Sequence, residues 1–238
     1  MTAKLLEGQE EGFMGILTAI EVFDPEAVIK ISKDGTFNCN FMDAANILGF
    51  DATSEIKFFK TKEDIECHIS VSKVLRVLKK LGKSEVEIEK EKITIKQGDS
   101  EIIIPNIEDI DVKPFKPIKA EFTISYLVDV KDLRNKADIL KEFGSKVGMV
   151  VDKKICLTTW ENPLNKASLV LETITNTEEK KPIKSGLNLE YLENIIKILP
   201  KDCKIDFIET DREGAPIRFS FTNNDINYTI YLAPLVEI

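Results

Sequence analysis

One pattern of apolar residues occurs twice in the chain, in Val71–Leu81 (VSKVLRVLKKL) and 118 positions later in Leu189–Leu199 (LEYLENIIKIL). In both segments the apolar side chains recur at i, i+3, i+6, i+7 and i+10. Because this spacing brings them to one face of a helix, both segments are predicted to be amphipathic helices. The recurrence of the pattern indicates an internal duplication.

Three short apolar segments follow each of these helices, and all six are predicted to be β-strands. They cover residues 85–88, 92–96 and 101–105 after the first helix, and residues 204–207, 217–221 and 228–234 after the second. In each set the first two segments alternate apolar and polar residues, and turn residues such as Gly98 and Asn224 separate the strands.

The segments upstream of the two helices are also similar. Helices are predicted near residues 9–22 and 130–142, each followed by two strands, at 27–31 and 36–39 and at 146–150 and 155–158. A further strand is expected at 166–174. The linker from 106 to 119 contains Pro114 and Pro117, which disfavour regular structure. The sequence therefore predicts an α+β protein with two similar domains, residues 1–105 and 120–238, joined by the 106–119 linker.

The composition is that of a globular protein. The 238 residues are 43% apolar and 31% charged, and the net charge is −8. No apolar run approaches the ~20 residues that a membrane-spanning helix needs. The N-terminus turns acidic at Glu7, so no signal peptide is expected.

Few residues of the kinds that carry catalysis or bind metals are present. The four cysteines, at 39, 67, 156 and 203, lack the paired spacing of a metal site and are expected to be reduced thiols in or near the core of an intracellular protein. A single histidine, His68, argues against a His-rich metal site or a His-based triad. Gly82-Lys83-Ser84 lacks the first glycine of a P-loop. We therefore expect no catalytic residue, no metal and no cofactor.

Positive charge is concentrated on the first of these predicted helices, taken here with its flanking residues as 70–83. Four of its cations fall within an arc of about 80°, with Lys79 close by, and no acidic residue occurs between Glu66 and Glu85. A solvated helix face is the alternative, but such faces usually mix signs, so phosphate binding is favoured. The predicted helix at 9–22 offers only acidic residues. The candidate DNA-binding residues are Lys73, Arg76, Lys79, Lys80, Lys83, Lys131, Arg134, Lys141 and Lys197. Contacts of this kind position a protein on DNA without reading bases.

Several segments, in this order along the chain, resemble proliferating cell nuclear antigen (PCNA), the ring-shaped sliding clamp of archaea and eukaryotes. They are Phe41–Leu48 (FMDAANIL), Leu189–Leu192 (LEYL), Gly214–Phe219 (GAPIRF) and Tyr231–Pro234 (YLAP). The resemblance spans nearly the whole chain and is that of a divergent member. It implies two clamp domains per chain in a closed trimeric ring, with helices lining a pore around duplex DNA and antiparallel sheets outside.

The resemblance also implies a function and a set of partners. Such clamps bind double-stranded DNA without sequence preference and perform no chemistry. They tether DNA polymerase, the clamp loader and other replication and repair enzymes that carry clamp-interacting peptides. The chain is also expected to assemble with copies of itself or with sister subunits. No membrane partner is expected. The expected location is intracellular, on DNA.

Two further sites follow from the resemblance. The partner-peptide pocket would contain Met42, Ile47, Val112, Phe115, Pro216, Tyr231, Ala233 and Pro234. The subunit interface would pair the strand at 101–105 with the strand at 166–174, through Glu101, Ile102, Ile103, Ile104, Ala167, Leu169 and Leu171.

Three alternatives remain open at the level of sequence. The chain could be one subunit of a heterotrimeric clamp or a checkpoint-type clamp, which signals DNA damage instead of supporting processivity. It could also be a clamp-like interaction protein that does not act on DNA.

Overall fold

The computed structural model describes residues 2–107, 113–152, 154–160, 166–175, 183–208 and 215–235. The chain divides into two compact units. The first comprises residues 1–44, 50–115 and 222–228, and the second comprises residues 45–49, 116–221 and 229–238. Within the described residues, no helix is both long and apolar enough to cross a membrane.

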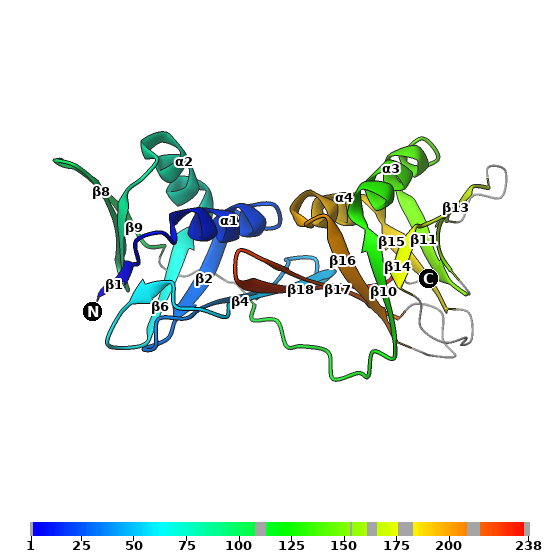
Figure 1. Cartoon of the computed structure of the whole chain (residues 1–238), viewed down its shortest axis with the longest axis horizontal. Coiled ribbons are helices and arrows are strands. Elements are labelled where there is room, and N and C mark those ends of the chain that lie inside the picture. The colour runs from blue at the N-terminus through cyan, green and yellow to red at the C-terminus, as the bar shows by residue number, and fades with distance from the viewer. Residues whose placement is uncertain are drawn as a thin grey trace. The chain divides into compact units, whose positions relative to one another are not determined.

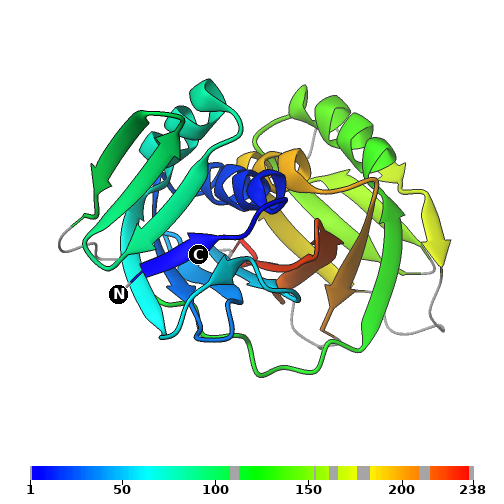
Figure 2. The ribbon, with the colours of Figure 1, turned by 60° about the vertical axis from the view of Figure 1, so that its left-hand side comes forward.

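The first unit contains two antiparallel sheets and two helices. One sheet has the order β5 (Phe59–Lys60), β1 (Thr2–Leu5), β7 (Glu85–Glu89), β8 (Lys92–Gln97), β9 (Ser100–Pro105). The other strands have the order β4 (Leu48–Ser54), β3 (Phe37–Met42), β2 (Glu26–Ile31), β6 (Ile65–Ser70). Helices α1 (Glu10–Glu21) and α2 (Val71–Leu81) pack against each other on one side of these strands (Figure 1). Figure 2 shows β1, in blue, beside β7 at the start of the β7–β8–β9 meander.

The second unit repeats this arrangement. Five of its strands have the order β14 (Thr173–Thr175), β10 (Ile124–Asp129), β16 (Asp202–Phe207), β17 (Ile217–Asn223), β18 (Ile226–Leu232). The other four have the order β13 (Ser168–Val170), β12 (Ile155–Thr159), β11 (Lys146–Val151), β15 (Ile183–Asn188). Helices α3 (Val130–Lys141) and α4 (Leu189–Ile198) pack together as α1 and α2 do (Figure 1). The four predicted helices and the α+β class are confirmed, and the repeat extends to strand order.

Local sequence explains how the helices begin. Helices α2, α3 and α4 each start at the residue after a strand. Asp129 accepts a hydrogen bond from the Asp132 N–H at the start of α3, and Asn188 accepts one from the Glu190 N–H at the start of α4. Each side chain satisfies an amide that the helix leaves unpaired. Helix α2 has no such side-chain cap, so the packing of its apolar face carries more of its stability.

The expected strand at 166–174 is wrong in one respect. The structure divides it into β13, which pairs with β12, and β14, which pairs with β10. The chain changes partners at Leu171 and Glu172, where the Leu171 N–H donates to the Ile155 carbonyl and the Glu172 carbonyl accepts from the Asp129 N–H. One apolar run therefore serves two neighbouring strand pairs.

The cysteines differ in their environments. All four are free thiols; Cys39, Cys67 and Cys203 are buried and Cys156 is half-buried. Cys39 and Cys67 lie on the two strands that flank Ile29 of β2. Burial raises the pKa of Cys67 and of Cys203 to about 12 and raises that of Cys39 further. These three thiols are protonated at neutral pH and therefore poor nucleophiles.

We expect an alkylating reagent at about pH 8, near the ordinary thiol pKa, to modify one cysteine of the native chain, Cys156. All four should react in denaturant. Intact mass and peptide mapping give the count and the position. Rapid modification of Cys39 in the native protein would contradict the burial of β3.

Candidate functional site

The cationic face of α2 is exposed and largely free. Val71, Val74, Leu75 and Leu78 are buried and hold the helix against the unit. On the opposite face lie exposed side chains that have no carboxylate partner among the described residues, namely Lys73, Arg76, Lys79 and Lys80. Lys83 lies 3.3 Å from Glu7, but both are mostly exposed, so solvent weakens this pair. The structure therefore brings the four predicted cations of α2 to one exposed face of the helix.

The predicted cations of the second unit are mostly engaged within the unit. Arg134 donates to the Ile196 carbonyl at 3.2 Å, and Lys197 donates to Asn194 Oδ1 at 2.7 Å. Lys141 Nζ lies 2.7 Å from Glu193 Oε1, and the hydrogen bond to Glu193 and its charge raise the pKa of Lys141. Lys131 is exposed and has no ion pair in the described part of the chain. Among the described residues, the candidate cations of α2 therefore lack carboxylate partners, whereas three of the four candidate cations of α3 and α4 bond within their unit.

The predicted pocket residues of the first unit lie where the linker meets β3. The Met42 N–H donates to the Lys113 carbonyl at 2.9 Å, which forms an isolated bridge. Met42 is half-buried and Phe115 is buried. Val112 lies outside the described residues.

The predicted pocket residues of the second unit gather around the end of the chain. The Ile47 carbonyl accepts from the Ala233 N–H at 2.8 Å. Ile47, Pro216, Ala233 and Pro234 are half-buried, and Tyr231 is buried. These residues come from segments far apart in sequence, and most of their side chains are partly accessible. We call this set of five residues the apolar wall.

The backbone groups of β9 divide between the sheet and an open edge. The Asn106 N–H donates to the Glu91 carbonyl, so these two residues form a hydrogen-bonded pair. Along an antiparallel ladder, hydrogen-bonded pairs alternate with pairs that are not hydrogen-bonded. It follows from the register that Ile102 and Ile104 bond to β8, whereas the backbone groups of Glu101 and Ile103 face away from it. The Ile103 side chain is 52% exposed.

Strand β13 forms a second open edge by the same logic. The Thr159 N–H donates to the Ala167 carbonyl and the Leu171 N–H donates to the Ile155 carbonyl. Leu169 therefore bonds to β12, and the backbone groups of Val170 face outward. Val170 is 45% exposed. Within the part of the chain that the structure describes, each unit thus has an edge strand whose outward backbone groups are unpaired and which carries an exposed apolar side chain. Such an edge is a template for pairing with another chain.

Sequence comparisons give no relative: no protein-family model matches the chain, and no curated protein does. Comparison of structures gives many. The chain matches PCNA from Thermococcus kodakaraensis with a TM-score of 0.80 at 16% identity, over 98% of this chain and 100% of the other. It matches a subunit of the PCNA2–PCNA3 complex from Sulfolobus tokodaii with a TM-score of 0.74 at 17% identity, over 100% of both chains. The fold is that of PCNA. A third match, with a TM-score of 0.79 at 16% identity over 100% of both chains, is to A. fulgidus PCNA bound to the C-terminal region of FEN-1.

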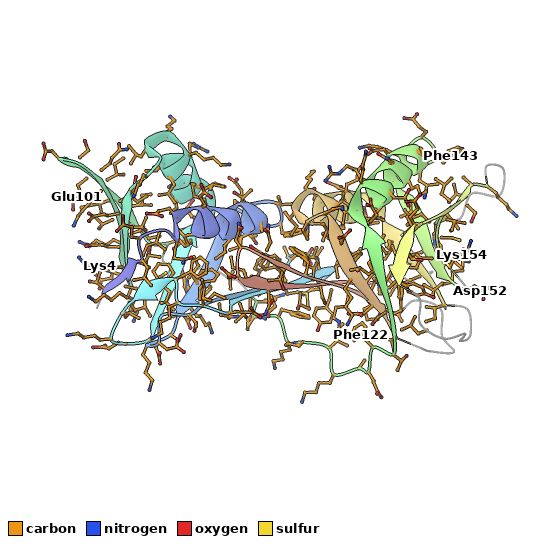
Figure 3. All side chains as sticks on the ribbon, in the orientation of Figure 1. Lys4, Glu101, Phe122, Phe143, Asp152 and Lys154 are labelled. Atoms are coloured by element: carbon orange, nitrogen blue, oxygen red, sulfur yellow. The ribbon has the colours of Figure 1, made fainter. Side chains whose placement is uncertain are left out.

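The PCNA fold of this chain carries apolar side chains that sequence reasoning missed. Ile139 on α3 is exposed, and so is Phe143 just after it, which Figure 3 labels. Helix α3 packs on β12, the neighbour of the β13 edge. The sequence could have indicated the exposure of Ile139, because this residue falls outside the apolar face that Leu133, Ala137 and Leu140 define.

Phe122 is another residue that the sequence analysis did not include among the pocket residues. It precedes β10, where Figure 3 labels it, and its ring centroid lies 5.9 Å from that of Tyr231. It adds a half-buried aromatic ring to the predicted pocket residues of the second unit. Its signal is a lone aromatic residue between the proline-containing linker and a strand.

Proposed function

We propose that this chain is a subunit of a ring-shaped DNA sliding clamp, a processivity factor that encloses duplex DNA and holds polymerase on it. The observation that supports this most is the free cationic face of α2 on an acidic chain with the PCNA fold. Phosphate contacts from such a face carry no sequence preference, as sliding requires. The proposed role is tethering, without chemistry of its own, at DNA inside the cell during replication and repair.

The proposed ring forms by strand pairing between subunits. The open edges of β9 and β13 belong to different units of the chain, so a head-to-tail contact between copies leaves one edge of each kind free until the ring closes. Closure removes both edges. Three clamp-fold chains, each with domains at 1–105 and 120–238 joined by the 106–119 linker, make the proposed ring. A sister chain could take a place in it, since one matched structure is a complex of two PCNA chains.

Retention on DNA circles tests enclosure. After loading by a clamp loader, the protein should remain on closed circular DNA through dilution and high salt, and it should leave when the circle is cut. Retention that does not depend on topology would contradict enclosure, and absence of binding would favour an interaction protein that does not act on DNA.

Light scattering of the purified chain tests its assembly. A mass three times that of one chain supports a self-sufficient ring. A stable monomer would instead indicate that sister subunits are required.

The proposed partner site is the apolar wall that includes Ile47, Pro216 and Tyr231. One matched clamp is bound to the C-terminal region of FEN-1, which supports a peptide groove at the pocket residues that the resemblance implies for this chain. We infer that it takes short peptides with a glutamine and paired aromatic residues, supplied by polymerases, the clamp loader and repair enzymes. A few apolar anchors usually carry most of such binding energy.

Replacing Ile47 and Pro216 together with alanine is expected to weaken binding of such a peptide about ten- to a hundredfold, since the apolar surface removed is worth on the order of 1–3 kcal/mol. Calorimetry measures the affinity. Ile56→Ala, at an exposed residue of the first unit, is the control and should bind normally. Equal affinity of the double variant and the wild type would show that the groove lies elsewhere.

A further inference from the structure

A row of polar side chains crosses the sheet of the second unit. Ser125 on β10, Asp206 on β16 and Arg218 on β17 are directly opposite one another in three neighbouring strands. Opposite residues in antiparallel strands present their side chains on the same face of the sheet. Asp206, in the middle of the row, is 0% exposed.

Both carboxylate oxygens of Asp206 have donors. Ser125 Oγ donates to Oδ1, Lys204 Nζ lies 3.2 Å from the same oxygen, and Arg218 Nε donates to Oδ2 at 2.8 Å. Burying a carboxylate is costly unless it is paired and hydrogen-bonded, and this set of three donors meets that requirement. It also restrains the Arg218 guanidinium, because Nε can bond to Oδ2 only in a narrow range of orientations.

Arg218 makes a second contact, with Phe122. Its Cζ lies 4.1 Å from the centroid of the Phe122 ring, within the range of a cation–π interaction. The centroid of the same ring lies 5.9 Å from that of Tyr231, and the two rings are tilted by 57°. The Thr123 N–H donates to the Phe207 carbonyl at 3.1 Å, which anchors the backbone next to Phe122. The ring therefore contacts a restrained cation and lies near a buried tyrosine.

We propose that Arg218, oriented by Asp206, is a positioning residue for the partner-peptide groove: it holds Phe122 beside Tyr231 as a preformed aromatic wall. This inference rests on the proposed function. A side chain that is already ordered spares the complex the entropy of ordering it on binding, so the wall raises peptide affinity.

Two variants test the role of the guanidinium, with calorimetry of a peptide carrying the glutamine and paired aromatic residues. Arg218→Lys keeps a cation for Asp206 but loses the planar group that stacks on Phe122. The double variant Asp206→Asn with Arg218→Met removes both charges and leaves no buried ion unpaired, so it guards against loss of folding. Each should weaken peptide binding roughly two- to tenfold, the range of a cation–π contact. Lys204→Met is the matched control, because Lys204 pairs with Asp206 whereas the cation over the Phe122 ring is Arg218, and its affinity should be unchanged.

Phe122→Ala separates positioning from a general structural effect. In that background Arg218→Lys should change the affinity little, because the ring on which the guanidinium acts is gone. An equal loss in both backgrounds would overturn the positioning role. Normal affinity of both Arg218 variants, with a wild type that binds the peptide, would overturn the inference alone. A wild type that does not bind would overturn the peptide groove and the inference together.

Discussion

Changing Lys73, Arg76 and Lys80 to glutamate is expected to abolish most DNA-dependent stimulation of a polymerase while leaving the chain folded. These exposed cations have no carboxylate partner in the described residues, and the apolar residues that hold α2 in place are on its other face. Each phosphate that the protein no longer neutralises lowers the slope of log affinity against log salt by about 0.9, so three such phosphates lower it by roughly three units. Titration of a short duplex at several salt concentrations measures the slope, and primer extension measures stimulation.

Two controls sharpen this test. The first control replaces three other exposed lysines of the first unit with glutamate, namely Lys33, Lys62 and Lys90. It changes the net charge by as much as the α2 variant does, but it should leave the salt slope close to that of the wild type. Reversal of Lys141 and Lys197 should have a smaller effect than the α2 variant, because both already bond within their unit. Stimulation and a salt slope equal to those of the wild type in the α2 variant would refute the assignment.

If the chain assembles into the proposed ring, Ile103→Pro is expected to give a smaller, folded species. The Ile103 N–H faces away from β8, so proline removes a donor of the open edge and leaves the β8–β9 ladder intact. Val170→Pro should act in the same way on β13. Sedimentation measures the species, and circular dichroism and thermal unfolding show whether the chain is folded.

Ile103→Thr separates the backbone from the side chain. Threonine keeps the N–H and removes part of the apolar contact, so this variant should assemble more strongly than the proline variant. Proline at Leu169 serves a different purpose: the Leu169 N–H belongs to the ladder with β12, and its removal should lower the stability of the unit itself. An Ile103→Pro variant that sediments like the wild type would place the interface elsewhere.

The sequence by itself determined the four helices, most of the strands and their repetition. The apolar face of Val71–Leu81 and its recurrence at 189–199 depend only on residues three and four apart, so local pattern suffices. Strands such as β6 and β10 were missed although they alternate apolar and polar residues, because each runs directly into a helix without a turn residue to mark its end.

Only the tertiary structure decided which candidate residues are available. The sequence offers Arg134 and Lys141 as candidate DNA-binding residues, but it does not show their partners, Ile196 and Glu193, which lie more than 50 positions away. Register alone shows that Ile103 and Val170 face open edges while Leu169 does not, and strand pairing alone brings Arg218 to Asp206 and Phe122. The physical reason is that periodicity is set by neighbours in the chain, whereas pairing, burial and charge compensation are set by residues that meet only after the sheets have formed.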